Sequence, residues 1–115
     1  MKEASFVYST DLLSYKFNDN HPFNQKRLQI TVDLLKKMNA LNEDDCIKPR
    51  MATDEELSLV HDPDYISAIR LAGQGKLDPD KALNYGIGTE DTPIFSGMHE
   101  ASAWLVGGTL SAVDE

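Results

Sequence analysis

The chain offers only two or three short strands beside much longer helical patterns. Its two clearest β-prone runs cover residues 5–9 and 46–51. A lone pair of strands is rarely stable in water, because it buries too little apolar surface. These runs therefore predict that the chain is part of a larger α/β domain, in which further strands complete the sheet.

The strongest helical pattern runs from residue 24 or 25 to residue 38. Apolar side chains recur there at helical spacing and form one stripe, made of Leu28, Val32, Leu35 and Met38. Ile30 and Leu34 widen that stripe. Such a broad apolar face predicts a helix that is covered on more than one side.

Two more helices begin at recognisable caps. Thr53 and Glu56 have the spacing of a capping box, in which each side chain accepts a hydrogen bond from the backbone N–H of the other residue. Asp62-Pro63 predicts another start, because aspartate is a good N-cap and proline suits the first helical position. We expect that helix to reach about residue 72 and to end at Gly73.

Thr92-Pro93 repeats this signal and predicts the start of a final helix, with one face made of Met98, Ala101, Leu105, Gly108 and Ala112. Residues 10–23 and 73–85 are expected to be loops, and Asp78-Pro79-Asp80 in the second is interpreted as a turn. The final helix ends in the acidic pair Asp114-Glu115, which opposes the helix dipole. This ending favours a chain cut within its last helix, while fraying at a natural terminus is the alternative.

Composition is compatible with one globular unit, residues 1–115, with 41% hydrophobic and 26% charged residues. The net charge of -8 argues against a nucleic-acid partner, which requires a basic patch. It suits a cationic partner such as a lysine-rich peptide, although solubility explains it equally well. A single cysteine, Cys46, and the lack of a signal-like or membrane-spanning run favour the cytoplasm and no membrane partner.

The sequence contains no self-contained metal site. The three histidines, His21, His61 and His99, stand about forty residues apart without a second ligand at zinc-binding spacing. Gly86-x-Gly88 is too short for a dinucleotide fingerprint. No catalytic or metal-binding residue is therefore assigned within the chain.

Two polar segments have both a functional and a structural interpretation. Arg27 lies in the first turn of a predicted helix, where the helix dipole disfavours a cation, so its side chain either points inward towards an anionic group or is simply solvated. Glu90-Asp91 precedes the expected final helix, where carboxylates also act as caps. Local physics leaves both pairs of alternatives open.

Read in order, a set of short segments resembles the opening of the histone deacetylase superfamily, and above all the bacterial acetoin-utilisation deacetylases. The segments are Tyr8-Ser9, His21-Pro22 through Arg27, Leu34-Leu35, residues 49–53 with Glu55-Glu56, residues 61–66, residues 88–93, Phe95-Ser96-Gly97 and Gly107-Gly108-Thr109. The resemblance implies an arginase/deacetylase-like α/β fold, an open and mostly parallel sheet flanked by helices. This chain would be its helix-rich N-terminal portion.

The resemblance also implies site roles. Asp91 would sit at the rim of the active-site tunnel and accept hydrogen bonds from substrate backbone N–H groups. Arg27 would line the inner channel through which acetate leaves, while His21 and His61 would be structural. Members of the family use zinc and a histidine pair to hydrolyse acetylated lysine, and those residues would lie beyond residue 115.

The resemblance thus predicts the substrate-rim and inner-channel portion of a zinc-dependent deacetylase, linked to acetoin or acetate metabolism. Its partner would be acetylated lysine in proteins, or alternatively an acetylated polyamine. A different class of function also remains open: a stand-alone, non-catalytic module for binding or oligomerisation. The sequence does not define the oligomeric state.

Overall fold

The computed structural model describes residues 4–115. Its elements, in chain order, are β1 (Phe6–Val7), the 3-10 helix η1 (Thr10–Leu13), α1 (Lys26–Lys37), the 3-10 helix η2 (Glu43–Asp45), β2 (Cys46–Ile47), α2 (Asp54–Leu57), α3 (Pro63–Gly73), α4 (Pro79–Asn84) and α5 (Met98–Asp114). The helix-rich α/β character predicted from the sequence is confirmed.

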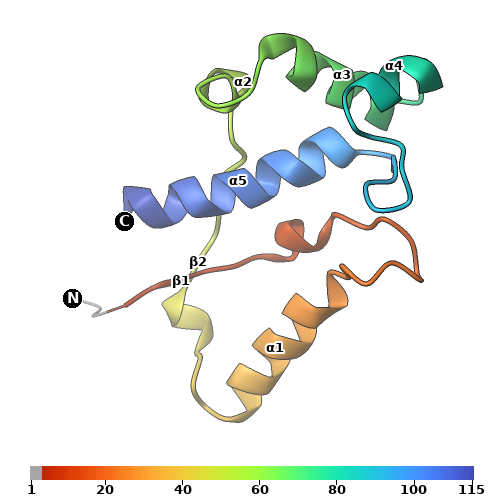
Figure 1. Cartoon of the computed structure of the whole chain (residues 1–115). Coiled ribbons are helices and arrows are strands. Elements are labelled where there is room, and N and C mark those ends of the chain that lie inside the picture. The colour runs from red at the N-terminus through yellow and green to blue at the C-terminus, as the bar shows by residue number, and fades with distance from the viewer. Residues whose placement is uncertain (1–3) are drawn as a thin grey trace.

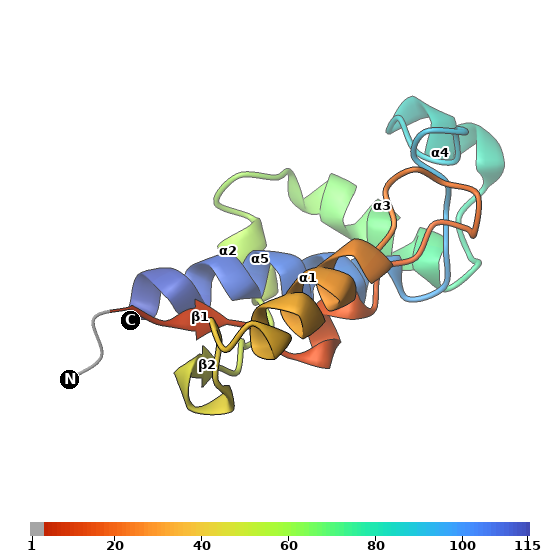
Figure 2. The same cartoon turned by 90° about the horizontal axis from the view of Figure 1, so that it is seen from below.

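Helix α5 organises the structure. It packs against α3 on one side and against η1 and β1 on the other, so it lies between two layers (Figure 1). Seen from below, α1 lies in front of α5, on the side away from α3 (Figure 2). The main hydrophobic cluster lies where α3, α4 and α5 meet and consists of Ala72, Ala82, Ile87 and Met98.

The two strands pair in parallel, with Phe6 opposite Cys46 and Val7 opposite Ile47. Parallel neighbours need a crossover connection, usually a helix, and α1 lies in that connection. Both strands are much shorter than the predicted runs. Residues 10–23 also differ from the predicted loop, because Ser9 caps η1 by accepting a hydrogen bond from the Asp11 backbone N–H.

The predicted caps of α2 and α3 are confirmed. The Thr53 hydroxyl accepts from the Glu56 N–H at 3.2 Å, and the Glu56 carboxylate accepts from the Thr53 N–H at 3.0 Å. Asp62 caps α3 by accepting from the Asp64 N–H at 2.8 Å. Helix α3 ends at Gly73, so the predicted end of this helix is also confirmed.

The interpretation of residues 78–80 as a turn is wrong, because they begin α4. Asp78 accepts from the Asp80 N–H at 2.8 Å and Pro79 occupies the first turn, which repeats the cap of α3. The helix start predicted at Thr92-Pro93 is also wrong. Helix α5 begins at Met98, after Gly97 with a left-handed φ of 75°, and Thr92 instead donates its hydroxyl to the Gly86 carbonyl at 2.8 Å.

Residues 50–52 pack closely against the backbone of α5. The Ala52 N–H donates to the Ala103 carbonyl at 3.0 Å, and the Arg50 N–H donates to the Ser111 hydroxyl at 3.0 Å. A Cβ on Gly107 would lie only 2.8 Å from the Ala52 nitrogen and closer still to the Arg50 carbonyl oxygen. Glycine therefore permits this contact, and no other residue type fits without moving the segment.

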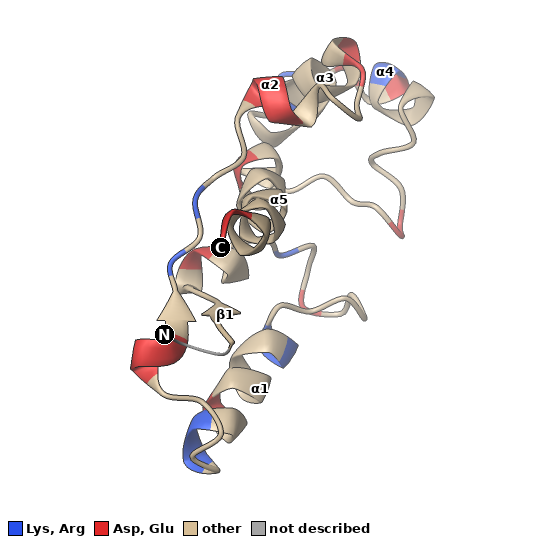
Figure 3. Cartoon of the chain, turned by 90° about the vertical axis from the view of Figure 1, so that its left-hand side faces the viewer, with Lys and Arg blue, Asp and Glu red and all other residues tan. Residues whose placement is uncertain are grey.

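The acidic end of α5 has a partner in the structure. The Arg50 guanidinium bridges Glu56 of α2 at 2.7 Å and Asp114 of α5 at 3.3 Å, where Figure 3 shows acidic residues on both helices. The Arg50 hydrogen bonds, followed by the Thr53 N–H, lower the pKa of Glu56 to about 2. The unfavourable position of Asp114 relative to the helix dipole is thus offset by a cation.

The described residues leave much of their apolar surface uncovered. On α1, Val32 is buried, but Ile30, Leu34 and the C-cap residue Met38 are 65%, 55% and 65% exposed, so residues 4–115 cover only one side of that helix. The radius of gyration is 16.1 Å, compared with ~13 Å for a compact domain of this length. Within residues 4–115, no helix combines the length and hydrophobicity that a membrane crossing requires.

Candidate functional site

The loop that leads to Arg27, at the start of α1, and the loop that carries Asp91 meet in space. The first follows η1 and leads into α1, and the second connects α4 to α5. The His21 Nε2 lies 2.9 Å from the Asp91 backbone carbonyl oxygen, although 70 positions separate the two residues. The segment from His21 to Arg27 and the loop of residues 88–93 therefore lie side by side.

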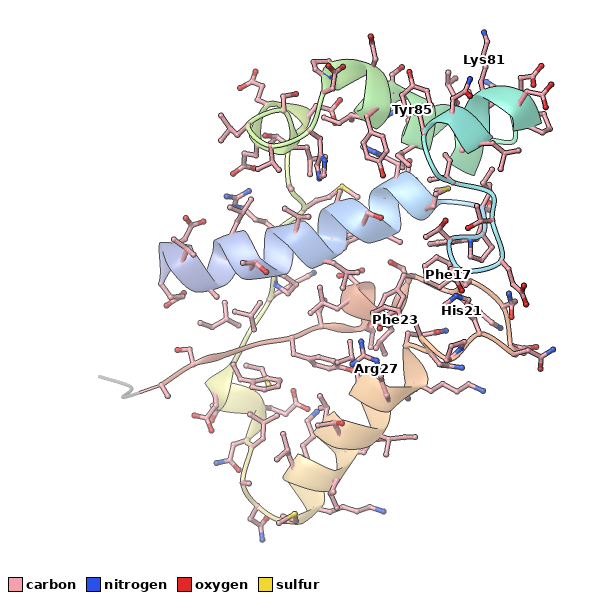
Figure 4. The ribbon with its side chains drawn as sticks, in the orientation of Figure 1. Phe17, His21, Phe23, Arg27, Lys81 and Tyr85 are labelled. Carbon is pink, nitrogen blue, oxygen red and sulfur yellow. The ribbon has the colours of Figure 1, made fainter. Side chains whose placement is uncertain are left out.

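Aromatic side chains hold the two loops together. The ring of Phe17 lies 4.4 Å from that of His21 and meets Phe95 edge-on at 5.5 Å, centroid to centroid. Phe23 packs on Tyr15 at 5.2 Å. Figure 4 shows Phe17, His21 and Phe23 gathered where the first loop passes beside the second. The sequence did not predict this cluster. Its only sign in the sequence is the presence of several aromatic side chains in residues 10–23.

Arg27 lies against this cluster. Its guanidinium carbon is 4.5 Å from the centre of the Phe23 ring, a cation–π geometry, and Nη2 donates to the Tyr15 hydroxyl at 3.4 Å. Tyr15 is buried and Arg27 is exposed. The aromatic contacts orient the guanidinium, and within residues 4–115 no carboxylate pairs with it.

Asp91 lies at the tip of a loop that is closed by its own hydrogen bonds. The Gly88 N–H donates to the Thr92 carbonyl at 2.9 Å, and the Thr92 N–H donates to the Thr89 hydroxyl at 3.1 Å. Gly88 has a φ of 83°, which favours glycine. Asp91 is exposed, and its carboxylate makes no hydrogen bond or ion pair within the described part of the chain.

A largely apolar cleft of about 300 Å³ lies beside both loops. Both loops contribute to its wall, with Phe17 and Phe23 from the first and Thr92 and Pro93 from the second. Most of the other lining residues come from α3 and α5, and Leu57 of α2 and His61 also take part. A concave, mostly apolar surface with a few polar groups at its edge is the usual form of a ligand site. The Thr92 to Pro93 segment connects Asp91 to this cleft.

A network of polar side chains, formed by Asp54, Arg70 and His99, lies next to the cleft. Arg70 Nη2 lies 2.7 Å from both carboxylate oxygens of Asp54 and 2.9 Å from Nε2 of the buried His99. The hydrogen bonds from Arg70 lower the pKa of Asp54. This network ties α2, α3 and α5 together, so its arrangement is explained by packing.

The described residues do not provide a metal site. Among residues 4–115, no group of three histidine, cysteine, aspartate or glutamate side chains is close enough to hold an ion. His61 and His99 both line the cleft, and His21 connects the two loops beside it. His21 and His99 use their ring nitrogens in hydrogen bonds to Asp91, Phe23 and Arg70.

Comparison with known proteins gives a consistent result. The family model described as a histone deacetylase domain matches residues 21–115. The acetoin utilization protein AcuC of Bacillus subtilis is 54% identical over 114 residues, which cover 99% of this chain and 30% of that protein. AcuC of Staphylococcus xylosus is 48% identical over 112 residues, covering 97% of this chain and 29% of that protein.

Solved structures agree. The crystal structure of an HDAC homolog from Aquifex aeolicus matches with a TM-score of 0.87 and 31% identity over 99% of this chain and 31% of that chain, and the same values hold for an HDAC homolog complexed with SAHA. The fold is therefore arginase/deacetylase-like. The chain spans about 30% of the length of the AcuC proteins that it matches. It belongs to the histone deacetylase family.

Proposed function

We propose that the protein containing this chain is a zinc-dependent deacetylase that hydrolyses acetyl-lysine to lysine and acetate, in the cytoplasm and in connection with acetoin or acetate metabolism. Residues 1–115 contribute the substrate rim and the inner channel of its single deacetylase domain. The observation that carries this proposal is Asp91, whose exposed carboxylate lies on a self-closed loop next to an apolar cleft.

Asp91 suits the recognition of a peptide backbone. A carboxylate accepts several hydrogen bonds at once, and bonds to a charged group are worth ~1.5–3 kcal/mol each. Its loop is closed by hydrogen bonds on both sides of Thr92, so binding needs little ordering of the loop. In this role Asp91 holds the substrate N–H groups that flank the acetylated lysine.

Arg27 suits the acetate product. A guanidinium binds a carboxylate through two parallel hydrogen bonds, and the cation–π contact with Phe23 holds the guanidinium in place. One hydrogen bond to Tyr15 leaves other N–H groups available. The zinc proposed here would be held by the family's ligand residues, which the resemblance places beyond this chain.

The uncovered surface favours a part of a larger domain over a stand-alone module. Exposed apolar side chains on α1 and the extended shape of the described residues are both expected if further strands and helices pack on them. Thermal unfolding of the isolated chain separates the two ideas. A sharp transition in a monomer would support the module, whereas a broad transition or aggregation fits the larger domain.

The proposed reaction is tested by measuring acetate release by the protein that contains this chain. An acetyl-lysine peptide and an acetylated polyamine are compared as substrates, with and without a zinc chelator. We expect faster turnover of the peptide and loss of activity with the chelator. Preference for the polyamine would change the proposed substrate class, and no acetate release from either substrate would refute the deacetylase function.

A further inference from the structure

The side chain of His21 has a structural position that the assignment of Asp91 does not explain. Its imidazole connects the loop before α1 to the loop before α5 through the Asp91 carbonyl, at 2.9 Å. We propose that His21 is a positioning residue that fixes the Asp91 carboxylate at the substrate rim. This inference rests on the proposed function of Asp91 and adds a second residue to that site.

The partners of the ring assign its tautomer. The Phe23 backbone N–H donates to Nδ1 at 3.1 Å, so Nδ1 carries no proton and Nε2 carries one. The Nε2–H can therefore donate to the Asp91 carbonyl oxygen. Both ring nitrogens are used, one for a local turn and one for the distant loop.

The ring is also held by packing. Phe17 lies 4.4 Å from the His21 ring, and Phe17 in turn meets Phe95 edge-on at 5.5 Å. Phe95 belongs to the segment that follows Asp91. Two hydrogen bonds and one aromatic contact thus fix the direction in which Nε2–H points. Figure 4 shows the side chains of His21 and Phe17 close together.

A bond to the backbone carbonyl controls the side chain of the same residue. The carbonyl oxygen lies in the peptide plane between Asp91 and Thr92, so a hydrogen bond to it fixes the backbone at Asp91 and constrains the Cα–Cβ bond from which the carboxylate extends. The loop's own hydrogen bonds hold Gly86, Gly88 and Thr92. Residue 91 itself is held across to the other loop only by His21, within the described part of the chain.

Two substitutions separate the local turn from the distant contact. The amide oxygen of asparagine can replace Nδ1 and accept from the Phe23 N–H, as in an Asx-turn, but the shorter side chain does not reach Asp91. Glutamine places an N–H₂ donor near the position of Nε2 and can restore the bond to the Asp91 carbonyl. If His21 serves only the local turn, His21→Asn should keep its activity, because it keeps the bond to Phe23. If His21 positions Asp91, as we propose, His21→Gln should keep its activity, because it keeps the bond to Asp91.

The test is a double-mutant cycle in the complete protein, with an acetyl-lysine peptide as substrate and kcat and KM measured separately. Asp91→Ala should lower kcat/KM by about 10-fold or more, because it removes charge-assisted hydrogen bonds. His21→Ala and His21→Asn should lower it with the same division between kcat and KM, and by no more than Asp91→Ala does, because His21 acts only through that carboxylate. His21→Gln should restore most of the activity, and His21→Ala should add almost nothing in the Asp91→Ala background.

The results distinguish the inference from the function on which it rests. If Asp91→Ala lowers kcat/KM but His21→Asn behaves as the wild type, the inference is wrong and the function of Asp91 stands. Losses that multiply in the double mutant also refute it. If Asp91→Ala leaves kcat/KM unchanged, Asp91 is not a substrate residue, and the proposed role of His21 is wrong together with it.

Discussion

The contact between residues 50–52 and α5 makes Gly107 the most sensitive glycine of the fold. In Gly107→Ala the new Cβ would lie 2.8 Å from the Ala52 nitrogen and nearer still to the Arg50 carbonyl oxygen. Both neighbours are backbone atoms, so a rotamer change does not relieve the clash. Either residues 50–52 move away from α5, or the helix shifts.

The cost follows from the interactions that the movement breaks. Displacing residues 50–52 removes the hydrogen bonds from Ala52 to Ala103 and from Arg50 to Ser111, which are worth ~1 kcal/mol each. Overpacking adds ~1–3 kcal/mol, while alanine in place of glycine inside a helix returns ~1 kcal/mol. We expect Gly107→Ala to lower the free energy of unfolding by about 2–4 kcal/mol.

Gly108→Ala is the matched control, because it makes the same change one position further along α5. Its Cβ would meet only the end of the Leu12 side chain, at 3.4 Å, so helix propensity should make this variant neutral or slightly more stable. The assay is urea unfolding of the complete protein, followed by circular dichroism. A Gly107→Ala variant as stable as Gly108→Ala would refute the close contact between residues 50–52 and α5.

Two other predictions concern charged residues. Glu56 has a pKa of about 2 in the folded chain, below its ordinary value of 4.5, so its stabilising effect is complete above pH 4.5 and is lost as the pH falls towards 2. Glu56→Gln should therefore lower the urea midpoint at pH 7 and match the wild type near pH 2, unlike the exposed control Glu55→Gln; an equal loss at both pH values would contradict the ion pair with Arg50. Arg27→Met should weaken product inhibition by acetate by about 10-fold or more, since it removes charge-assisted hydrogen bonds; an unchanged inhibition constant would exclude Arg27 from the acetate channel.

Local signals in the sequence predicted local structure well. Thr53, Glu56, Asp62 and Pro63 cap the helices that they were expected to cap, because a cap depends on atoms within four residues. The same aspartate–proline signal at Asp78 begins a helix and not the predicted turn. Helix α4 is only six residues long and is stabilised by Ala82 in the core.

Contacts between residues far apart in the chain could not be predicted from local sequence patterns. Thr92 has the residue type of a cap, but its hydroxyl is used by the Gly86 carbonyl, a choice that depends on how the loop closes. The contact between His21 and Asp91 joins residues that are far apart in the chain. The resemblance to a family indicated that these loops matter, and only the fold shows that they touch.

The most direct test of this account is kcat/KM for an acetyl-lysine peptide in Asp91→Ala compared with Glu90→Ala, measured in the complete protein. Both residues are exposed neighbours on one loop, and both changes remove one carboxylate. We predict a loss of about 10-fold or more for Asp91→Ala, as expected for lost charge-assisted hydrogen bonds, and a much smaller loss for Glu90→Ala. Equal values for the two variants would contradict the assignment of Asp91 to the substrate rim.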